Sequence, residues 1–349
     1  MMKDKNGENA VLSWLGERPT RPVGVTWGVP WKEGELSRDT PLALYGTNGE
    51  SLPVQSWPMA FWPDGSLKWT AHAAVFPGDP GEQFELVRGE GTVVSAPLAV
   101  QETVDTIEVD TGAIRCRIGR SGTRVLREIW RNGKQICTGG TLIGLHERRL
   151  RTTGKTTIVE EPFQGVVEQT VVEQAGPLRA VIRIAGHHPM DGHRRKWLPF
   201  VLRLYFYAGI ESIRLVYTFI YDGNPHQDLI KGLGIRFVVP MTGPLYNRHL
   251  RFAGDTGLFS ESPKGLMLFR LQDRQRRLYE QQTAGAFIRF DDMRDAQLLA
   301  LLDDSPVWGD FKLTQVSSDS YNFQTHPQRV QLDPGGGWQQ IRRAGLCRQ

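Results

Sequence analysis

Apolar and polar residues alternate along most of this chain, which is the period of a β-strand. Between residues 21 and 97 the alternating runs are short and are separated by turn residues. Beyond residue 101 the runs are longer, as in residues 105–119, 177–186 and 212–223. Asn132-Gly133 between two such runs is a strong two-residue hairpin signal. The pattern predicts an all-β fold, with a small barrel or sandwich in residues 1–100 and a large antiparallel β-sandwich in residues 101–349.

One segment has a helical period instead. Leucines at positions 298, 299, 301 and 302 lie between acidic ends in residues 291–306, and Pro306 closes the run. We therefore expect one short helix in these residues.

Composition narrows the function classes. The 40% apolar and 23% charged content is typical of a globular protein, and no apolar run of about 18 residues is present. A net charge of +4 suits an anionic ligand but is too dispersed to favour nucleic acid. No membrane partner is expected either. Phosphate-loop and dinucleotide motifs are absent from the sequence, so we expect no cofactor.

Two features bear on the compartment. The three cysteines, Cys116, Cys137 and Cys347, are odd in number and share no metal-ligand spacing, which favours reduced thiols. The first residues, MMKDKNGENAVLSWLG, lack the apolar core of a signal peptide. We expect a cytoplasmic protein.

A basic segment, HHPMDGHRRK at residues 187–196, lies between two predicted strands. A loop held by rigid strands is a common place for functional groups. The segment supplies the candidates His188, His193, Arg194, Arg195 and Lys196. A solvated hairpin with Asp191-Gly192 as its turn explains the same residues and is favoured by the turn chemistry. The spacing of its histidines matches no recurrent zinc pattern, and no metal site is expected.

Two further segments supply candidates. In NRHLR, on a strand, Asn247, His249 and Arg251 would share one face, with Arg248 on the other. The alternative is an ordinary polar sheet face. The segment YDGNPHQD at residues 221–228 supplies Tyr221, Asp222, His226 and Asp228, although its Asp-Gly and Asn-Pro pairs are turn chemistry in their own right and explain most of it.

Tryptophans are dense near the N-terminus. They are Trp27, Trp31, Trp57, Trp62 and Trp69. These side chains could stack on sugars or pack within the fold, and packing is the better default for large amphipathic rings.

Six segments, in order, carry a resemblance to a known family. They are WGVPWKEGEL (27–36), WPDGSLKW (62–69), WLPFVLRLYFYAGIESIRLVYTFIYDG (197–223), DLIKGLGIRFVVP (228–240), YNRHLRFAGDTGL (246–258) and WGDFKLTQVSSDSYNF (308–323). The chain resembles the YetA-like and exo-rhamnogalacturonan lyase family of carbohydrate-active proteins. The resemblance implies an N-terminal RIFT-type barrel, a central β-sandwich and a C-terminal α/α toroid, which we expect to be missing from this chain. Tyr217 and Asn224 depart from the family pattern, which tends to have a histidine and an acidic residue at these positions.

The resemblance implies β-elimination on an acidic, rhamnose-containing oligosaccharide. Such a lyase needs a cation to neutralise the sugar carboxylate, a base to remove the neighbouring proton, and an acid for the leaving oxygen. The carboxylate partner would be Arg194, Arg195 or Arg251, with further substrate contacts from Lys196, Asn247, Arg248 and Asp222. The base would be His188, His193 or His249, and Tyr221 a possible acid. The alternatives are a catalytically incomplete carbohydrate-binding protein, a truncated family member, and a structural β-scaffold.

Overall fold

The computed structural model describes residues 9–190, 195–243, 248–254, 258–261, 311–317 and 320–325. Throughout these ranges the regular structure is β, so the predicted all-β class is confirmed. The expected helix in residues 291–306 lies outside the described residues. The chain divides into two compact units, Met1–Pro240 and Met241–Gln349.

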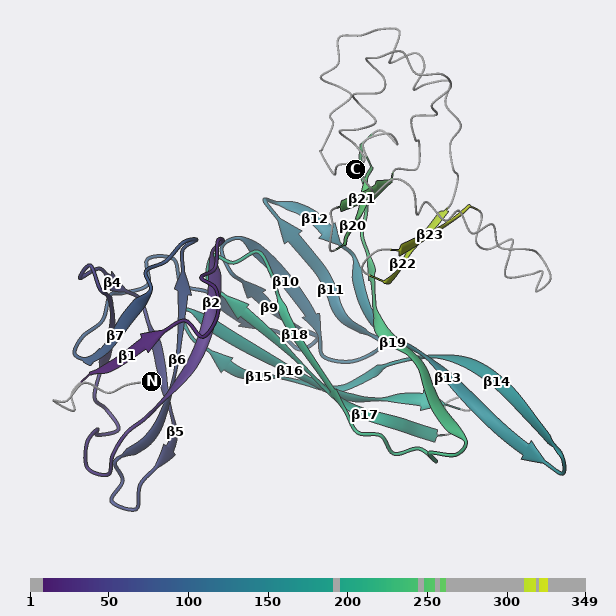
Figure 1. Ribbon diagram of the computed structural model, residues 1–349, viewed down its shortest axis with the longest axis horizontal. Helices are drawn as coiled ribbons and strands as arrows, with labels where there is room; N and C mark the ends of the chain where they lie inside the picture. Colours follow the sequence, from purple (N-terminus) through teal and green to yellow (C-terminus); the bar gives the residue numbers. More distant parts are fainter. Residues whose placement is uncertain are drawn as a thin grey trace, which may run out of the picture. The chain divides into compact units, whose positions relative to one another are not determined.

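An N-terminal module of two antiparallel sheets begins the first unit (Figure 1). One sheet has the order β1 (Ala10–Ser13), β7 (Gln83–Arg88), β3 (Leu42–Gly46) and β4 (Ser51–Leu52). The other has the order β2 (Val23–Pro30), β6 (Leu67–Phe76) and β5 (Gln55–Phe61). Buried side chains such as Val29, Leu44, Ala74 and Leu86 fill the space between the sheets.

The rest of the first unit is a sandwich. Its larger sheet contains β8 (Ala99–Glu102), β9 (Thr106–Asp110), β10 (Ile114–Gly119), β11 (Arg124–Arg131), β12 (Lys134–Cys137), β13 (Gly139–Thr152), β14 (Lys155–Gln164) and β19 (Asp228–Val238). Asn132 and Gly133 join β11 to β12 with φ angles of 51° and 71°. Positive φ at both residues is what a tight primed turn requires, and this confirms the predicted hairpin.

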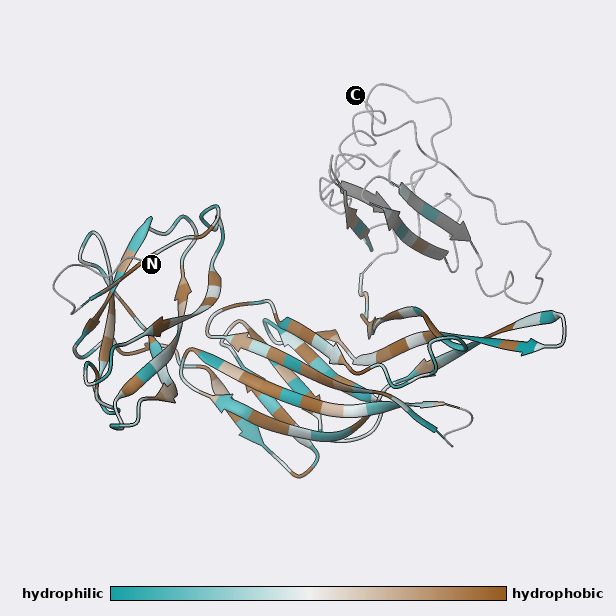
Figure 2. Cartoon of the chain, turned by 60° about the horizontal axis from the view of Figure 1, so that its bottom comes forward, coloured by the Kyte–Doolittle hydropathy of each residue, from teal (hydrophilic) through white to brown (hydrophobic). Residues whose placement is uncertain are grey.

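The smaller sheet of the sandwich contains β15 (Val166–Ala175), β16 (Arg179–Met190), β17 (Arg195–Tyr207) and β18 (Arg214–Phe219), in that order. Figure 2 shows hydrophobic and hydrophilic bands alternating along these strands. One face buries Ile182, Ile184, Leu202 and Leu204 against the larger sheet. The opposite face carries polar and aromatic side chains, and the candidate groove described below lies on it.

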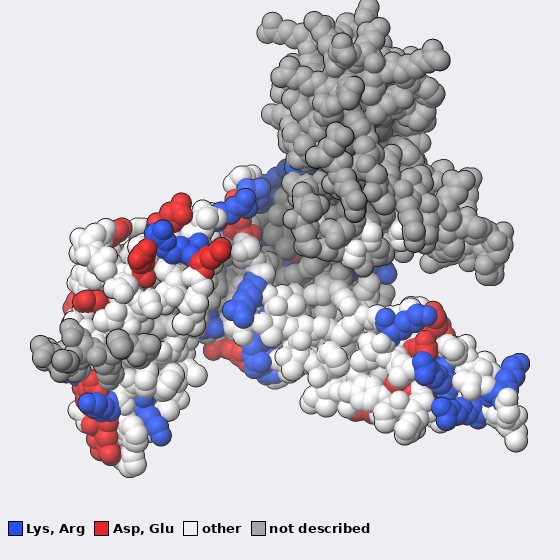
Figure 3. All heavy atoms as spheres, viewed as in Figure 1, with Lys and Arg blue, Asp and Glu red and all other residues white. Residues whose placement is uncertain are grey.

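The hairpin of β13 and β14 extends beyond the other strands of its sheet (Figure 1). Figure 3 shows Lys and Arg atoms prominent along it. The described part of the second unit consists of two hairpins, β20 (Leu250–Ala253) with β21 (Leu258–Glu261), and β22 (Phe311–Ser317) with β23 (Ser320–Thr325).

Tyr207 at the end of β17 links the N-terminal module to the sandwich. Its hydroxyl and the Thr26 Oγ1 are 2.8 Å apart in a hydrogen bond. Its ring lies against Gly24, where an added Cβ would come within 2.0 Å of the ring. A side chain at position 24 would therefore force the ring away, so this close approach requires glycine.

Candidate functional site

Several of the candidates named from the sequence gather where β17 begins, around the buried carboxylate of Asp228. Arg195 Nη1 donates to Asp228 Oδ2 at 3.1 Å, and the backbone N–H of Asn224 donates to the same oxygen at 2.9 Å. His146 Nε2 lies 3.0 Å from the other oxygen. Burial raises the pKa of Asp228, but hydrogen bonds from Asn224 and Arg195 outweigh this effect and hold the pKa below its usual value. We call Asp228, His146, Arg195 and Asn224 the Asp228 cluster.

His188 is fully buried beside this cluster. Its Nδ1 donates to the Leu198 carbonyl oxygen at 2.8 Å, so its Nε2 is the acceptor for the Tyr217 hydroxyl, also at 2.8 Å. Burial lowers the pKa of His188 and raises that of Tyr217. Both ring nitrogens are thus engaged in holding β16, β17 and β18 together, an arrangement that favours a structural role over that of a base.

Tyr221 and Asp222 shape the turn before β19. The Tyr221 hydroxyl donates to the backbone oxygen of Asp228 at 2.6 Å, and burial, with the Asp228 charge, raises the pKa of Tyr221. Asp222 Oδ1 accepts from the Leu198 backbone N–H at 2.9 Å. Leu198 has a φ of 43°, a strained conformation for leucine that this hydrogen bond helps to maintain.

The remaining candidates are dispersed. Lys196 Nζ lies 2.6 Å from Glu168 Oε1 on the exposed face of the sheet. In the second unit, Arg248 Nε donates to the Gly243 carbonyl at 2.9 Å. Burial, followed by the charge of Arg251, lowers the pKa of His249. Three further candidates, His193, Arg194 and Asn247, lie outside the described residues.

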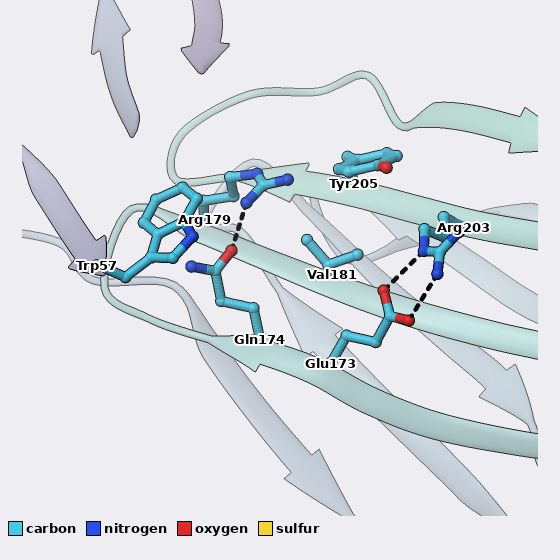
Figure 4. A pocket seen from close by; sticks show the side chains of 7 residues that line it. All are labelled: Trp57, Glu173, Gln174, Arg179, Val181, Arg203 and Tyr205. Carbon is cyan, nitrogen blue, oxygen red and sulfur yellow. Dashed lines mark hydrogen bonds and ion pairs between the residues drawn. The ribbon is translucent and has the colours of Figure 1, made fainter. Parts of the chain in front are cut away.

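A groove that sequence reasoning did not identify lies on the outer face of the smaller sheet, next to the N-terminal module. Its volume is about 390 Å³. It is lined by Trp57 from β5, Glu173 and Gln174 from β15, Arg179 and Val181 from β16, and Arg203 and Tyr205 from β17 (Figure 4). We call this hollow the Arg179 groove.

Arg179 is the central charge of the groove. Its guanidinium carbon lies 5.1 Å from the ring centroid of Trp57 and 5.1 Å from that of Tyr205. Its Nη1 donates to the side-chain oxygen of Gln174 (Figure 4). Within the described residues its Nε is buried without a hydrogen-bond partner, and no carboxylate forms an ion pair with it. The aromatic rings hold this cation in place by cation–π attraction.

Arg203, by contrast, is already neutralised. Its Nε and Nη2 donate to the two carboxylate oxygens of Glu173 at 2.7 and 3.0 Å, and these bonds raise the pKa of Arg203. Arg183 lies 3.3 Å from the same carboxylate. Arg214 stacks on Tyr205 at 5.7 Å. Among the residues that line the groove, Glu173 thus offsets Arg203, and Arg179 is the cation without a carboxylate partner in the described residues.

Gln55 of the N-terminal module fixes the backbone at Arg179. Its Oε1 accepts from the N–H groups of Leu178 and Arg179 at 3.0 and 2.8 Å. Gly176 leaves the space for this side chain, since a Cβ there would come within 2.3 Å of the Gln55 amide. Because β5 carries both Gln55 and Trp57, the module and the sandwich build the groove jointly.

The groove residues escaped sequence reasoning because each occupies an ordinary outward position of an alternating strand. Trp57 is one of five N-terminal tryptophans for which packing is the better default from sequence alone. The available signal was the recurrence of arginine and tyrosine at outward positions of the paired strands, Arg179 and Arg183 on β16 and Arg203 and Tyr205 on β17. This signal can be recognised only when the register between β16 and β17 is known.

Metal-binding clusters and membrane-spanning helices are both absent from the described part of the chain. It holds no group of three or more His, Cys, Asp or Glu side chains arranged to bind a metal ion. No helix in it has the length and apolar character needed to cross a membrane.

Comparison with known proteins identifies the class. Residues 8–89 match the family model of the PcRGLX-like N-terminal RIFT barrel domain, and residues 98–343 match that of the PcRGLX-like central beta sandwich domain. The chain belongs to this family, so the resemblance drawn from the sequence and the RIFT-barrel and sandwich architecture are confirmed. The domain boundaries at residues 100 and 101 stay a prediction.

A curated relative is similar over most of the chain. It is the uncharacterized protein YetA of Bacillus subtilis (strain 168), which is 40% identical over 312 residues. The match covers 89% of this chain and 36% of YetA, so the chain spans about a third of the length of that relative.

Proposed function

We propose that this chain binds an acidic oligosaccharide of the rhamnogalacturonan type through the Arg179 groove. The observation that carries the proposal is the Arg179 guanidinium, which is held between two aromatic rings and has no carboxylate partner in the described residues. A planar guanidinium donates hydrogen bonds to a carboxylate in a matching geometry. The family, which is related to rhamnogalacturonan lyases, supplies the class of ligand.

A second candidate function, β-elimination by the whole protein, is favoured by the family membership. In it, a bound cation stabilises the charge that develops on the sugar carboxylate as a base removes the neighbouring proton. His193 and His249 are the proposed bases and Tyr221 the proposed acid. We also propose that the protein is located in the cytoplasm.

The Asp228 cluster and the Arg179 groove lie too far apart to contact one sugar. Arg195 and Arg203 are eight positions apart on β17, a separation of roughly 26 Å at about 3.3 Å per residue. The groove is therefore proposed as a binding site in its own right, and it is tested by binding rather than by turnover.

Isothermal titration calorimetry with a galacturonate–rhamnose tetrasaccharide tests the binding proposal. Arg179→Ala is expected to weaken binding by roughly tenfold or more, because a charge-assisted contact is lost. Arg131→Ala is the matched control. It removes the same charge from the larger sheet, where Arg131 of β11 is paired with Glu211. Equal affinities for the wild type and Arg179→Ala would contradict the proposal.

The lyase candidate needs a separate measurement. Ultraviolet absorbance reports the unsaturated uronate that β-elimination forms. A steady rise with purified protein and the same tetrasaccharide, reduced by His249→Ala in a folded variant, would support it. A flat trace accompanied by calorimetric binding would leave the binding function alone.

A further inference from the structure

The outer face of the sheet β2–β6–β5 continues beyond the Arg179 groove. Strand pairing places Gly28, Ala71 and Trp57 in one row across this sheet. The neighbouring row toward the sandwich is covered, since Thr26 bonds to the Tyr207 hydroxyl. The row of Gly28 is the next one beyond that contact, and its member Trp57 lines the groove.

Trp69 lies over this row. It is two residues from Ala71 on β6, so the two side chains share a face. A Cβ added to Gly28 would come within 2.4 Å of Trp69 Nε1, which places the indole against the glycine backbone. The Trp69 residue nevertheless remains 43% exposed. Gly28 thus allows a large aromatic ring to lie along the sheet with part of its surface in solvent.

In this row Ala71 stands between Gly28, against which the Trp69 indole lies, and Trp57. Ala71 is 8% exposed and contributes only a methyl group. Since neighbouring strands are about 4.8 Å apart, the backbones at Gly28 on β2 and Trp57 on β5 are separated by roughly 10 Å. The row of Gly28, Ala71 and Trp57 contains no charged side chain. The aromatic and methyl surface that this row and Trp69 present suits the C–H face of a neutral sugar ring rather than a carboxylate.

We infer that Trp69, Ala71 and Trp57 form a second subsite, which binds a neutral sugar next to the acidic sugar held at Arg179. The inference rests on the proposed function of the Arg179 groove and extends it. Trp57 joins the two subsites, because it faces Arg179 on one side and stands opposite Ala71 in the row. An oligosaccharide in which acidic and neutral sugars alternate would fill both subsites, whereas a lone uronate would fill only the first.

Calorimetry with two probes, galacturonic acid and the galacturonate–rhamnose tetrasaccharide, tests the second subsite. Trp69→Ala is expected to weaken tetrasaccharide binding by roughly tenfold, since buried aromatic contacts often dominate binding, and to leave the monosaccharide affinity unchanged. Gly28→Ala should act in the same direction, because its Cβ would displace the Trp69 indole. Circular dichroism and thermal melts of both variants establish that they are folded.

Phe61→Ala is the matched control. Phe61 is also 43% exposed and lies in the same sheet, but it stands opposite the buried Leu67 and packs with Arg38. An equal loss of affinity in Phe61→Ala and Trp69→Ala would overturn the inference. So would an unchanged tetrasaccharide affinity in Trp69→Ala and Gly28→Ala, if Arg179→Ala loses binding. That last pattern leaves the proposed function intact. If Arg179→Ala also binds as tightly as the wild type, the proposed function itself fails.

Discussion

The guanidinium carbon of Arg179, on the sandwich, lies 5.1 Å from the centre of the Trp57 ring, on the N-terminal module. The contact makes the two parts of the first unit interdependent, because the sandwich supplies one ring against Arg179, that of Tyr205, and the module supplies the second. Gln55 lies on the same strand as Trp57, two residues before it, and its side chain accepts a hydrogen bond from the Arg179 backbone N–H. The position of the module on the sandwich therefore sets the geometry of the groove.

Replacing Trp57 with alanine tests this dependence. The change removes one of the two rings that hold the Arg179 guanidinium, a contact of about 0.5–2 kcal/mol. We expect tetrasaccharide affinity to fall by roughly threefold to tenfold, with a modest loss of stability. Calorimetry and urea unfolding measure the two effects. Unchanged affinity in a folded Trp57→Ala protein would show that the ring does not position the cation.

Gly24→Ala is expected to destabilise the junction between module and sandwich. Its Cβ would come within 2.0 Å of the Tyr207 ring, which packs among buried residues and cannot move freely. Overpacking of this kind costs about 1–3 kcal/mol. Gly16→Ala is the control, since nothing lies within 4 Å of a Cβ at that position. Equal unfolding midpoints for the two variants in urea would argue against close packing at position 24.

The buried histidine His72 should make stability fall in mild acid. Burial lowers the pKa of His72 to about 4, from 6.5. Below pH 6.5 the unfolded chain takes up a proton that the folded protein does not, so stability decreases as the pH falls toward 4, by up to about 3 kcal/mol. His72→Gln should flatten this dependence in unfolding experiments between pH 7 and 4. An unchanged slope in the variant would exclude His72 as its source.

Asp228 should also make the stability of the protein depend on pH, in a more acidic range than His72 does. Its pKa is held below the usual value, so its stabilising charge is present above the unfolded pKa and is lost as the pH falls through the folded one. Asp228→Asn should cost about 2 kcal/mol at neutral pH, where hydrogen bonds to a charged group are lost, and less in strong acid. Unfolding curves of both proteins at neutral and acidic pH would measure the difference. A cost that does not shrink in acid would contradict the assignment.

Strand alternation was enough to predict the all-β class and the sandwich, since burying one face of a sheet forces a period of two on the sequence. The hairpin at Asn132-Gly133 followed from local turn chemistry. The Arg179 groove could not be predicted in the same way, because Trp57 and Arg179 meet only through strand pairing and the docking of the module. The density of basic residues in the segment 187–196 made His188 a candidate, but its burial and its two hydrogen bonds depend on packing that the sequence does not show.

In the proposed function, the Arg179 guanidinium recognises a sugar carboxylate. A thermodynamic cycle tests it most directly, with calorimetry of the wild type and Arg179→Ala against the tetrasaccharide and its carboxyl-reduced, neutral counterpart. Coupled groups give non-additive losses in such a cycle. We predict that the wild type loses affinity when the sugar carboxyl is reduced, whereas Arg179→Ala binds both sugars equally weakly. If Arg179→Ala still prefers the acidic sugar as strongly as the wild type does, Arg179 is not the group that recognises the carboxylate.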